Sequence, residues 1–346
     1  METTAFGALE KTPLKVRVLI LNDAKELKLA VHSSYKIMDS ATNRELLSGK
    51  WLSQRTMSAD SSLHLREYAF DAEKIIVMPH KDGKIFMNGK YFRGDLVISK
   101  REKNLYVINI LDIDDYLRGV LYHEVSPEWP IEALKAQAIV ARTFALYQST
   151  ANKTKDYDLT SDTFSQMYGG LASERVKTNL AVSLTKGKVL TYNYKVFPAY
   201  YHATCAGSTE DAAVLWNIDI PPLKGVRCNF CNDSPHLKWD AVFDLKDIEK
   251  KLNDSSFNIK DITDINIVSY TPSGRENMLI IKSGEEEFRI SAKQLRQALG
   301  STIIRSTNFS VKVDKDSAIF KGLGWGHGVG MCQWGAYGMA KMGYKV

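Results

Sequence analysis

The stretch LYHEVSPEWPIEALKAQAIVARTFAL, residues 121–146, determines how the rest of the chain is interpreted. Its second half predicts a helix from Ile131 to about Tyr147, because Pro130 suits the start of a helix, where its missing N–H costs little. Small alanines recur through this helix, which predicts a buried central element that another backbone can approach closely. The first half is harder to explain, since it places the acidic Glu124 among apolar neighbours about six residues before the helix.

Length and composition set broad limits on the kind of protein. The 346 residues suffice for one large domain or two ordinary ones. The 44% hydrophobic and 25% charged residues are typical of a globular chain and argue against disorder. The net charge of +6 suits an anionic polymer such as cell wall or nucleic acid, although so small an excess is more often a solvated surface.

The pattern predicts an α+β fold in which the central helix carries Glu124 and β-rich portions surround it. From residue 15 to about 110, short alternating runs separated by Asp-Gly and Asn-Gly predict a β-rich N-terminal part made of hairpins. A short helix is expected over 112–122, leading to Glu124. Residues 240–320 predict a second α/β portion, and a weak domain boundary is expected near residue 240.

Glu124 is the first candidate for chemistry. A carboxyl group in an apolar, partly dry pocket has a raised pKa because burial disfavours its charged form, so it would serve as a general acid near neutral pH. The alternative is a surface glutamate that caps the helix. A metalloprotease interpretation that starts from His123 fails, because the HExxH pattern needs a second histidine where Pro127 stands.

The segment GLGWGHGVGMCQWGAYGMA, residues 322–340, is the second candidate. Its alternating glycines permit unusual φ angles and close approach of the backbone to a ligand, and they leave His327 free to project from a thin loop. It lacks the pattern of a phosphate-binding loop. The alternative is a tightly turned core loop. His202, in YYHATCAGST, is either a core histidine or part of a polar, aromatic surface that suits a sugar.

The cysteines form the third candidate. A C-x-x-C pair can hold one zinc ion, and a third thiolate with one histidine would complete a closed, structural site. Cys332 competes for the fourth place, and a disulfide or unrelated thiols are the alternatives. The predicted ligands are Cys205, Cys228, Cys231 and His236.

Five motifs occur together in one order. They are EVSPEWPIEALKAQAIVARTFAL (124–146), DTFSQMYGG (162–170), YYHATCAGSTEDAAVLW (200–216), SGR (273–275) and GWGHGVGMCQWGAYGMA (324–340). Together they resemble the stage II sporulation protein D family, also called SpoIID/LytB. The resemblance covers about residues 15–343, which would be one SpoIID-like catalytic region.

The resemblance implies a lytic transglycosylase that cleaves glycan strands of peptidoglycan between N-acetylmuramic acid (MurNAc) and N-acetylglucosamine (GlcNAc), leaving 1,6-anhydromuramyl ends. Glu124 matches the family's catalytic glutamate. A single carboxyl group suffices because the sugar's own 6-hydroxyl is the nucleophile, whereas ordinary glycosidases need two carboxylates. The alternative is a non-catalytic, peptidoglycan-binding enhancer of a cell-wall amidase, a role associated with the LytB branch.

By the same resemblance, further residues would line the glycan cleft, by binding sugar groups or by steering Glu124. These are Gln166, Tyr168, His202, Thr209, His327 and Gln333. Residues 150–165 lack the Cys and His of a zinc site that some sporulation members share, so any structural zinc is expected at the cysteines named above.

The N-terminal segment carries no charged-then-apolar signal pattern. Residues 1–14 are expected to be disordered or an added tail. Because the implied substrate is peptidoglycan, an exported, extracytoplasmic protein is expected, with its export segment missing from this chain. Peptidoglycan strands and a cell-wall amidase are the expected partners, and nucleic acid is not.

Overall fold

The computed structural model describes residues 7–8 and 14–346, and the chain divides into two compact units, residues 1–198 and 199–346. Both units mix helices and strands, which confirms the α+β class with a β-rich N-terminal part. The weak boundary expected near residue 240 falls inside the second unit. Apart from residues 7–8 and 14, the tail expected over residues 1–14 lies outside the described residues.

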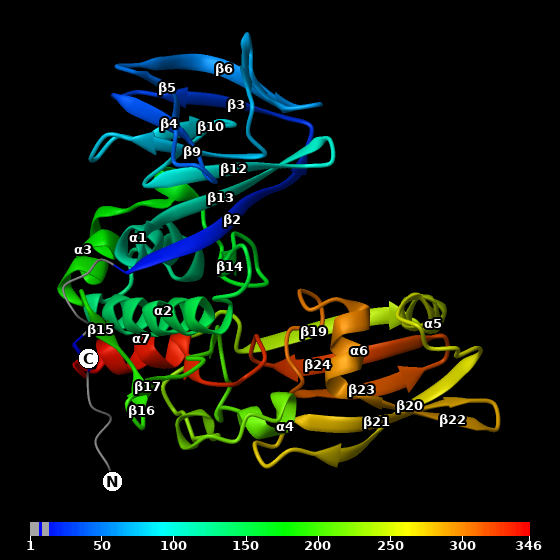
Figure 1. Ribbon diagram of the computed structural model, residues 1–346. Helices are drawn as coiled ribbons and strands as arrows, with labels where there is room; N and C mark the ends of the chain where they lie inside the picture. The colour runs from blue at the N-terminus through cyan, green and yellow to red at the C-terminus, as the bar shows by residue number, and fades with distance from the viewer. Residues whose placement is uncertain (1–6, 9–13) are drawn as a thin grey trace. The chain divides into compact units, whose positions relative to one another are not determined.

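The first unit begins with a β-rich part built from two antiparallel sheets and one parallel pairing (Figure 1). One sheet has the order β11 (Lys90–Phe92), β10 (Ile85–Met87), β3 (Glu26–Val31), β6 (Leu52–Ala59), β7 (Leu63–Leu65), β8 (Tyr68–Phe70). The other has the order β14 (Leu159–Thr160), β2 (Lys15–Ala24), β13 (Asn104–Asp112), β12 (Asp95–Arg101), β9 (Lys74–Pro79), β4 (Tyr35–Asp39), β5 (Glu45–Gly49). Strand β14 pairs in parallel with β2.

The local sequence explains these hairpins. Asn88 and Gly89 both adopt positive φ between β10 and β11, as a tight turn that follows the twist of the strands requires. Along β4 and β9 the buried residues alternate with more exposed ones, so Ile37, Ile75 and Val77 are fully buried. The hairpins predicted before residue 110 are therefore present.

Three helices follow at one end of the long strands β2 and β13 (Figure 1). They are α1 (Ile113–Glu124), α2 (Ile131–Ala151) and α3 (Val176–Leu184), with the short 3₁₀ helix η1 (Gly170–Ser173) between the last two. Two-stranded pairs complete the unit: β1 (Gly7–Ala8) with β15 (Lys188–Val189), and β16 (Thr191–Tyr192) with β17 (Lys195–Val196).

A buried ion pair ties these helices together. Asp112 caps α1 by accepting a hydrogen bond from the N–H of Asp114. Arg142, on α2, is only 1% exposed, and its Nε donates to Asp114 Oδ1 over 2.9 Å. The same guanidinium donates to the carbonyl of Val182 in α3 and to that of Lys188. One side chain thus links α1, α2, α3 and β15.

The second unit holds two three-stranded sheets around one hydrophobic core. Their orders are β19 (Lys238–Asp244), β24 (Ser317–Leu323), β23 (Phe309–Asp314), and β20 (Ile262–Tyr270), β21 (Glu276–Ser283), β22 (Glu286–Ser291). Helices α5 (Leu245–Asp254) and α6 (Ala292–Leu299) contribute Ile248, Leu252 and Leu295 to the core. A Ser291 capping box starts α6.

A pairing across a long stretch of sequence closes this unit. Strand β18 (Tyr201–His202) lies parallel to β25 (Met331–Cys332), and β19 pairs with β24. The first segments of this unit are therefore paired with its last ones. This pairing explains why the unit begins well before residue 240. The unit also contains α4 (Ala212–Trp216), η2 (Pro221–Leu223) and α7 (Gln333–Lys341). Over the described residues, every helix is too short or too polar to cross a membrane.

Candidate functional site

Glu124 is the last residue of α1 and is partly buried. Val125 is extended and ends the helix, and it packs with Leu134 and Ala181 while Trp129 covers the group. The structure therefore places the carboxyl group at the C-terminal end of one helix, six residues before Pro130 caps the next. The sequence correctly predicted that Glu124 lies about six residues before the central helix. The expectation that the central helix carries Glu124 is wrong, because Glu124 ends the shorter helix α1.

The phenol of Tyr116 lies within electrostatic reach of Glu124. Tyr116 is fully buried on α1, and burial first, then the negative charge of Glu124, raise the pKa of its hydroxyl well above the usual value. That hydroxyl donates a hydrogen bond to Gln166 Oε1 over 3.1 Å. Gln166 Nε2 in turn donates to the carbonyl of Ala141 on α2. Tyr116 and Gln166 are therefore hydrogen-bonded to each other and to α2, and the charge of Glu124 acts on Tyr116 from the same helix.

Tyr168 is buried against the same helix. Its hydroxyl donates to Asn109 Oδ1 over 2.9 Å, and its ring lies 5.2 Å from that of Tyr116. Gly119 makes room for it, since a Cβ there would lie 2.4 Å from Tyr168 Cε2. Gln166 and Tyr168 thus lie behind α1, where they make internal contacts that fix the helix bearing Glu124.

His123 lies beside Glu124, and its Nε2 is 2.6 Å from Ser173 Oγ in η1. Burial, with Lys90 and Arg175 as further causes, lowers the pKa of this histidine. A Cβ on Gly169 would lie 2.0 Å from Ser173 Oγ, so a side chain there would push the Ser173 hydroxyl aside. The sequence pattern did not predict Ser173 as a neighbour of the site, because nothing in its local sequence marks it.

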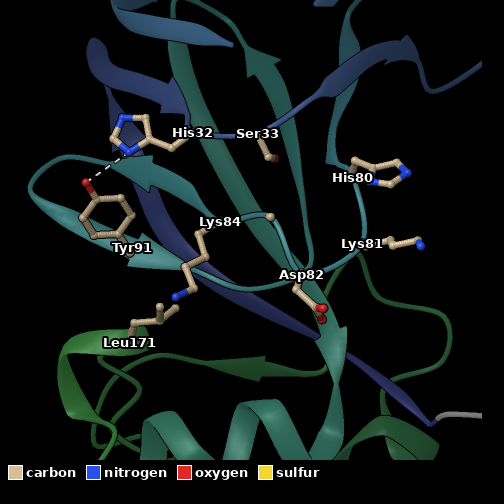
Figure 2. A pocket seen from close by; sticks show the side chains of 9 residues that line it. His32, Ser33, His80, Lys81, Asp82, Lys84, Tyr91 and Leu171 are labelled. Carbon is tan, nitrogen blue, oxygen red and sulfur yellow. Dashed lines mark hydrogen bonds between the residues drawn. The ribbon is translucent and has the colours of Figure 1, made fainter. Parts of the chain in front are cut away.

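A cavity of the first unit lies in its β-rich part, with a volume of about 640 Å³ (Figure 2). The ring of Trp51, 58% exposed, stacks on that of His32 at 4.3 Å, and Tyr91 Oη lies 3.3 Å from His32 Nδ1. Lys81 and Lys84 also line this cavity. The sequence analysis identified no candidate here. An exposed aromatic face beside amines can hold a polar ring or an anion.

The glycine-rich loop of the second unit, defined as residues 322–330, contains His327. Its alternating glycines have positive φ from +74° to +111° at Gly324, Gly326, Gly328 and Gly330. A Cβ at Gly330 would lie 2.1 Å from the carbonyl oxygen of Tyr200, so this close approach requires glycine. The predicted unusual φ angles are present at these four glycines, and the close approach seen is to the protein's own backbone, so approach to a ligand stays a prediction.

Two of the three histidines of this unit, His202 and His327, lie together. Their ring centroids are 5.6 Å apart, and Trp216 lies 5.0 Å from His327. His202 Nδ1 is 3.1 Å from the carbonyl of Val329, while its Nε2 is buried without a hydrogen-bond partner among the described residues. Burial first, then the positive charge of Arg296, lower the pKa of His327 to about 4, so it is neutral at neutral pH.

The other two predicted cleft residues of the second unit are largely buried. Thr209 exchanges hydrogen bonds with Val226, whose N–H donates to Thr209 Oγ1 over 2.8 Å. Gln333 is the first residue of α7 and follows Cys332 directly. Thr209 therefore shapes the loop around it, and Gln333 starts the helix that follows the glycine-rich loop.

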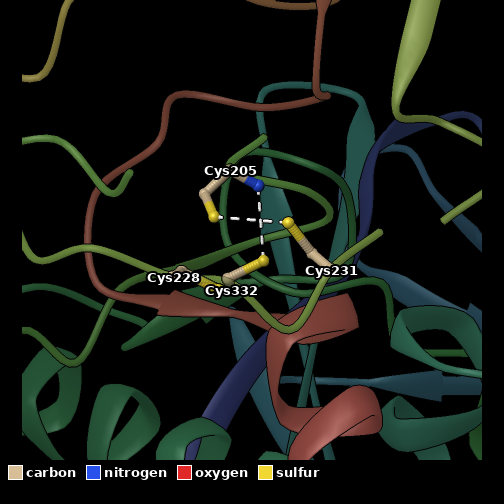
Figure 3. A group of neighbouring side chains, drawn as sticks. All are labelled: Cys205, Cys228, Cys231 and Cys332. Carbon is tan, nitrogen blue, oxygen red and sulfur yellow. Dashed lines mark hydrogen bonds between the residues drawn. The ribbon is translucent and has the colours of Figure 1, made fainter. Parts of the chain in front are cut away.

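Four cysteine sulfurs gather in the second unit (Figure 3). The Sγ atoms of Cys205, Cys228, Cys231 and Cys332 all lie within 4.8 Å of one another, and the cysteines are free. Hydrogen bonding, from Cys205 first, lowers the pKa of Cys228 to about 7.

The cysteine group differs from the predicted ligand set in its fourth member. Cys332 takes the place expected for His236, because the pairing of β18 with β25 brings Cys332 beside Cys205. The His236 ring instead packs edge-on against Trp325 at 4.6 Å. Cys332, considered from the sequence as a competitor, is the side chain that lies with the other three thiols.

Comparison of the sequence with known protein families matches two parts of this chain. The family model SpoIID, described as a stage II sporulation protein, matches residues 101–192, which include α1, α2 and η1. A second model, described as a domain of unknown function, matches residues 228–330.

Three relatives indicate the breadth of the similarity. An uncharacterized protein of Brachyspira hyodysenteriae is 32% identical over 94% of this chain and 88% of its own length. The stage II sporulation protein D of Bacillus subtilis is 32% identical over 71% of this chain and 73% of its own length. The amidase enhancer of Bacillus subtilis is 28% identical over 66% of this chain and 38% of its own length. Both family motifs and extended similarity agree, and the chain belongs to the stage II sporulation protein D (SpoIID/LytB) family.

Proposed function

We propose that this protein is a peptidoglycan lytic transglycosylase in which Glu124 is the catalytic acid and base. The observation that carries the proposal is the position of Glu124: a partly buried carboxyl group on the last residue of α1, whose charge acts on the buried Tyr116 of the same helix. A rigid helix held by the Arg142–Asp114 ion pair can keep one acid in a fixed position.

The proposed reaction needs one carboxyl group. Glu124, protonated, gives its proton to the oxygen that joins C1 of MurNAc to GlcNAc, and the C1–O bond breaks as positive charge develops on the muramyl ring. The oxygen of the 6-hydroxyl of the same sugar then bonds to C1. The proton of that hydroxyl passes to the Glu124 carboxylate, which restores the acid. The products are a 1,6-anhydromuramyl end and a free GlcNAc hydroxyl.

The end of α1 suits this alternation. The C-terminal end of a helix carries partial negative charge, which disfavours another negative charge there and favours a carboxyl group that keeps its proton. The next residue, Val125, packs with Leu134, and Trp129 packs against the same group. An acid so placed gives up its proton readily when a positive charge forms on the bound sugar.

Gln166 and Tyr168 act in this proposal as positioning residues. Both are buried and bonded to protein groups, so they steer Glu124 through Tyr116 and Gly119. In the second unit, His202 and Thr209 shape the loops around β18. His327, which is partly exposed, and Gln333 are proposed to bind sugar hydroxyl or acetamido groups.

The substrate determines where the protein works. Peptidoglycan lies outside the cytoplasmic membrane, so we propose an extracytoplasmic location. The second candidate function is a glycan-binding enhancer of a cell-wall amidase, and the similarity to the amidase enhancer of Bacillus subtilis supports it. The two functions differ in one requirement, because only the enzyme needs the Glu124 carboxyl group.

The test is a digest of purified peptidoglycan, intact and stripped of stem peptides, with wild type, Glu124→Gln and Glu128→Gln. Glu128 is the matched control, since it is exposed and lies in the loop between α1 and α2, four residues after Glu124. Loss of a general acid reduces the rate about 10²–10⁴-fold, so 1,6-anhydromuramyl products should appear with wild type and Glu128→Gln alone. Mass spectrometry of the digest identifies the products.

Each other result excludes part of the proposal. Cleavage that survives in Glu124→Gln would contradict the assignment of the acid. No cleavage by wild type of either substrate, together with retained glycan binding in a sedimentation assay, would favour the enhancer. Preference for the stripped glycan would mean that an amidase acts before this enzyme.

A further inference from the structure

We infer that Cys205, Cys228, Cys231 and Cys332 form a tetrathiolate zinc centre that holds the glycine-rich loop of the second unit in place. The inference rests on the geometry of the sulfurs, on the groups that face them and on the segments they connect. It is independent of the proposed reaction at Glu124.

The spacing of the sulfurs fits one tetrahedral ion (Figure 3). All four Sγ atoms lie within 4.8 Å of one another, and those of Cys205 and Cys231 are 3.6 Å apart. Zinc–sulfur bonds of about 2.3 Å place tetrahedral ligand sulfurs about 3.8 Å apart. The sulfurs of a disulfide are about 2.05 Å apart. The observed spacing therefore matches ligands of one ion better than oxidised pairs.

Backbone donors already face the sulfur of Cys332. The N–H of Cys205 donates to it over 3.3 Å, and that of Gly335 donates over 3.2 Å at the start of α7. Such donors stabilise a thiolate, which is the form that binds metal. Gly335 also fits tightly, since a Cβ there would lie 2.8 Å from Cys228 Sγ.

A buried cation lies next to the sulfurs. Arg275 is 1% exposed, and its Nη2 donates to the carbonyl of Cys205 over 2.8 Å. Within the described residues its Nε and Nη1 have no hydrogen-bond partner. A divalent ion held by four thiolates keeps a net negative charge, and this guanidinium, which also faces the carboxylates of Glu210 and Glu276, lies close enough to Cys205 and Cys332 to attract it.

The ligand chemistry fits a single zinc ion rather than a metal cluster. Four sulfurs in a tetrahedral arrangement bind zinc or iron, and sulfurs this close together leave room for one ion, whereas an iron–sulfur cluster spreads its thiolates further apart. Four protein ligands close the coordination shell, so the ion has no open position for substrate. The centre is therefore structural.

The centre joins three segments that regular elements hold weakly. Cys205 follows the two-residue strand β18, Cys228 and Cys231 lie in a loop, and Cys332 ends β25. Isolated bridges already connect Thr204 with Trp325, and Glu210 with Val329. A metal at the four sulfurs would anchor the loop that carries His327 just after its C-terminal end, through Cys332, and would hold the segment that bridges to Trp325, through Cys205.

The first test measures metal in the purified full chain by elemental analysis. About one zinc per chain is expected in wild type, and none after Cys332→Ser. His236→Ala is the matched control and should keep its zinc, because it changes the histidine that the sequence offered as the fourth ligand. Loss of zinc in His236→Ala, with retention in Cys332→Ser, would overturn the ligand assignment.

Cobalt exchange provides a readout that does not depend on any variant folding. Cobalt(II) in wild type should give the intense sulfur-to-metal absorption and the visible bands of a tetrahedral tetrathiolate site. Hydrogen exchange should speed up in peptides from residues 199–346 after chelation, while residues 14–198 stay unchanged. Absence of zinc, with two disulfides found by alkylation and mass spectrometry, would overturn the inference, and so would stoichiometric iron.

Discussion

The helix end that carries Glu124 and the glycine-rich loop that carries His327 hold their side chains in opposite ways. In the first unit, a twelve-residue helix is capped by Asp112, tied by Arg142 and backed by Tyr168. In the second unit, the loop around His327 has little regular structure, and it follows the positive φ angles of alternating glycines.

The difference shows how a fold can fix an irregular segment. Repeated backbone hydrogen bonds and a buried ion pair position the helix end, so its geometry depends on the first unit's own core. The loop lacks a comparable ladder of hydrogen bonds and depends on close backbone contacts, on Arg275 and, by our inference, on a metal. A substitution or a change of pH that destabilises one of the two regions should therefore leave the stability of the other unchanged.

The largest effect is expected from Arg142→Met. The change leaves Asp114 as an uncompensated charge in the core of the first unit, which costs about 3–5 kcal/mol of unfolding free energy. Hydrogen exchange of peptides from residues 14–198 would measure it. Peptides from the second unit should keep their wild-type protection.

Arg118→Met is the matched control for that change. Arg118 pairs with Asp115 on the same helix, but both side chains are 29% exposed. An exposed pair contributes about 0.2–1 kcal/mol, so this variant should stay close to wild type. Equal losses in the two variants would show that the buried ion pair has no special part in holding α1.

A smaller effect, confined to the second unit, is expected from Gly328→Ala. Gly328 has a φ of +88°, and a Cβ there would lie 2.9 Å from Arg275 Nε. Backbone strain of about 1–3 kcal/mol adds to this overlap. Gly89→Ala is the control, since Gly89 has a φ of +86° with open space around it among the described residues. If thermal unfolding shows equal losses of stability in the two variants, the contact with Arg275 does not contribute to the effect of Gly328→Ala.

Acid should weaken the second unit through His327. Burial lowers its folded pKa to about 4, while an unfolded histidine titrates near about 6.5. Between these two pKa values the histidine is protonated in the unfolded chain but not in the folded one. The free energy of unfolding therefore falls by about 1.4 kcal/mol for each pH unit below 6.5. His202, Arg275 and Arg296 face this ring and disfavour its charge.

The comparison of wild type with His327→Gln isolates this contribution. Urea unfolding at several pH values, followed by hydrogen exchange of second-unit peptides, should show a shallower pH dependence in the variant. An unchanged slope would assign the acid sensitivity to other groups.

The smallest effect is expected from Tyr168→Phe. The variant loses the hydrogen bond to Asn109 Oδ1 and leaves that acceptor buried, which costs about 1–3 kcal/mol before relaxation and nearer the lower value if water enters. If Glu124 is the acid, turnover should fall while substrate affinity stays the same, because the residue acts on the position of α1. A loss of affinity alone would mean direct contact with the glycan.

Much of the fold could be predicted from local patterns. The helix after Pro130 and the hairpins before residue 110 follow from apolar periodicity and turn residues, and the structure contains both. The unit boundary could not be predicted, because it depends on β18 pairing with β25, and two-residue strands leave no periodic signal. The motifs also identified Glu124, whereas its neighbour Tyr116 has no local mark of its own.

The cysteine group shows the same limit. The spacing C-x-x-C was visible in the sequence, but the choice between His236 and Cys332 depended on a contact between distant segments. A sequence motif groups residues that lie close together along the chain, so it suggested His236 as a metal ligand beside Cys231. In the fold, the register of β18 against β25 decides which residue joins the cysteines. That register places Cys332 opposite His202.

The separation of Cys205 from Cys332 has a consequence for biosynthesis. The two residues are 127 positions apart. A ribosome adding about 5–20 residues per second therefore exposes the first thiol on the order of ten seconds before the last one exists. During that interval three cysteines are available for oxidation with each other. Reducing surroundings, or prompt shielding of the nascent chain, would decide which chains reach the four-sulfur state.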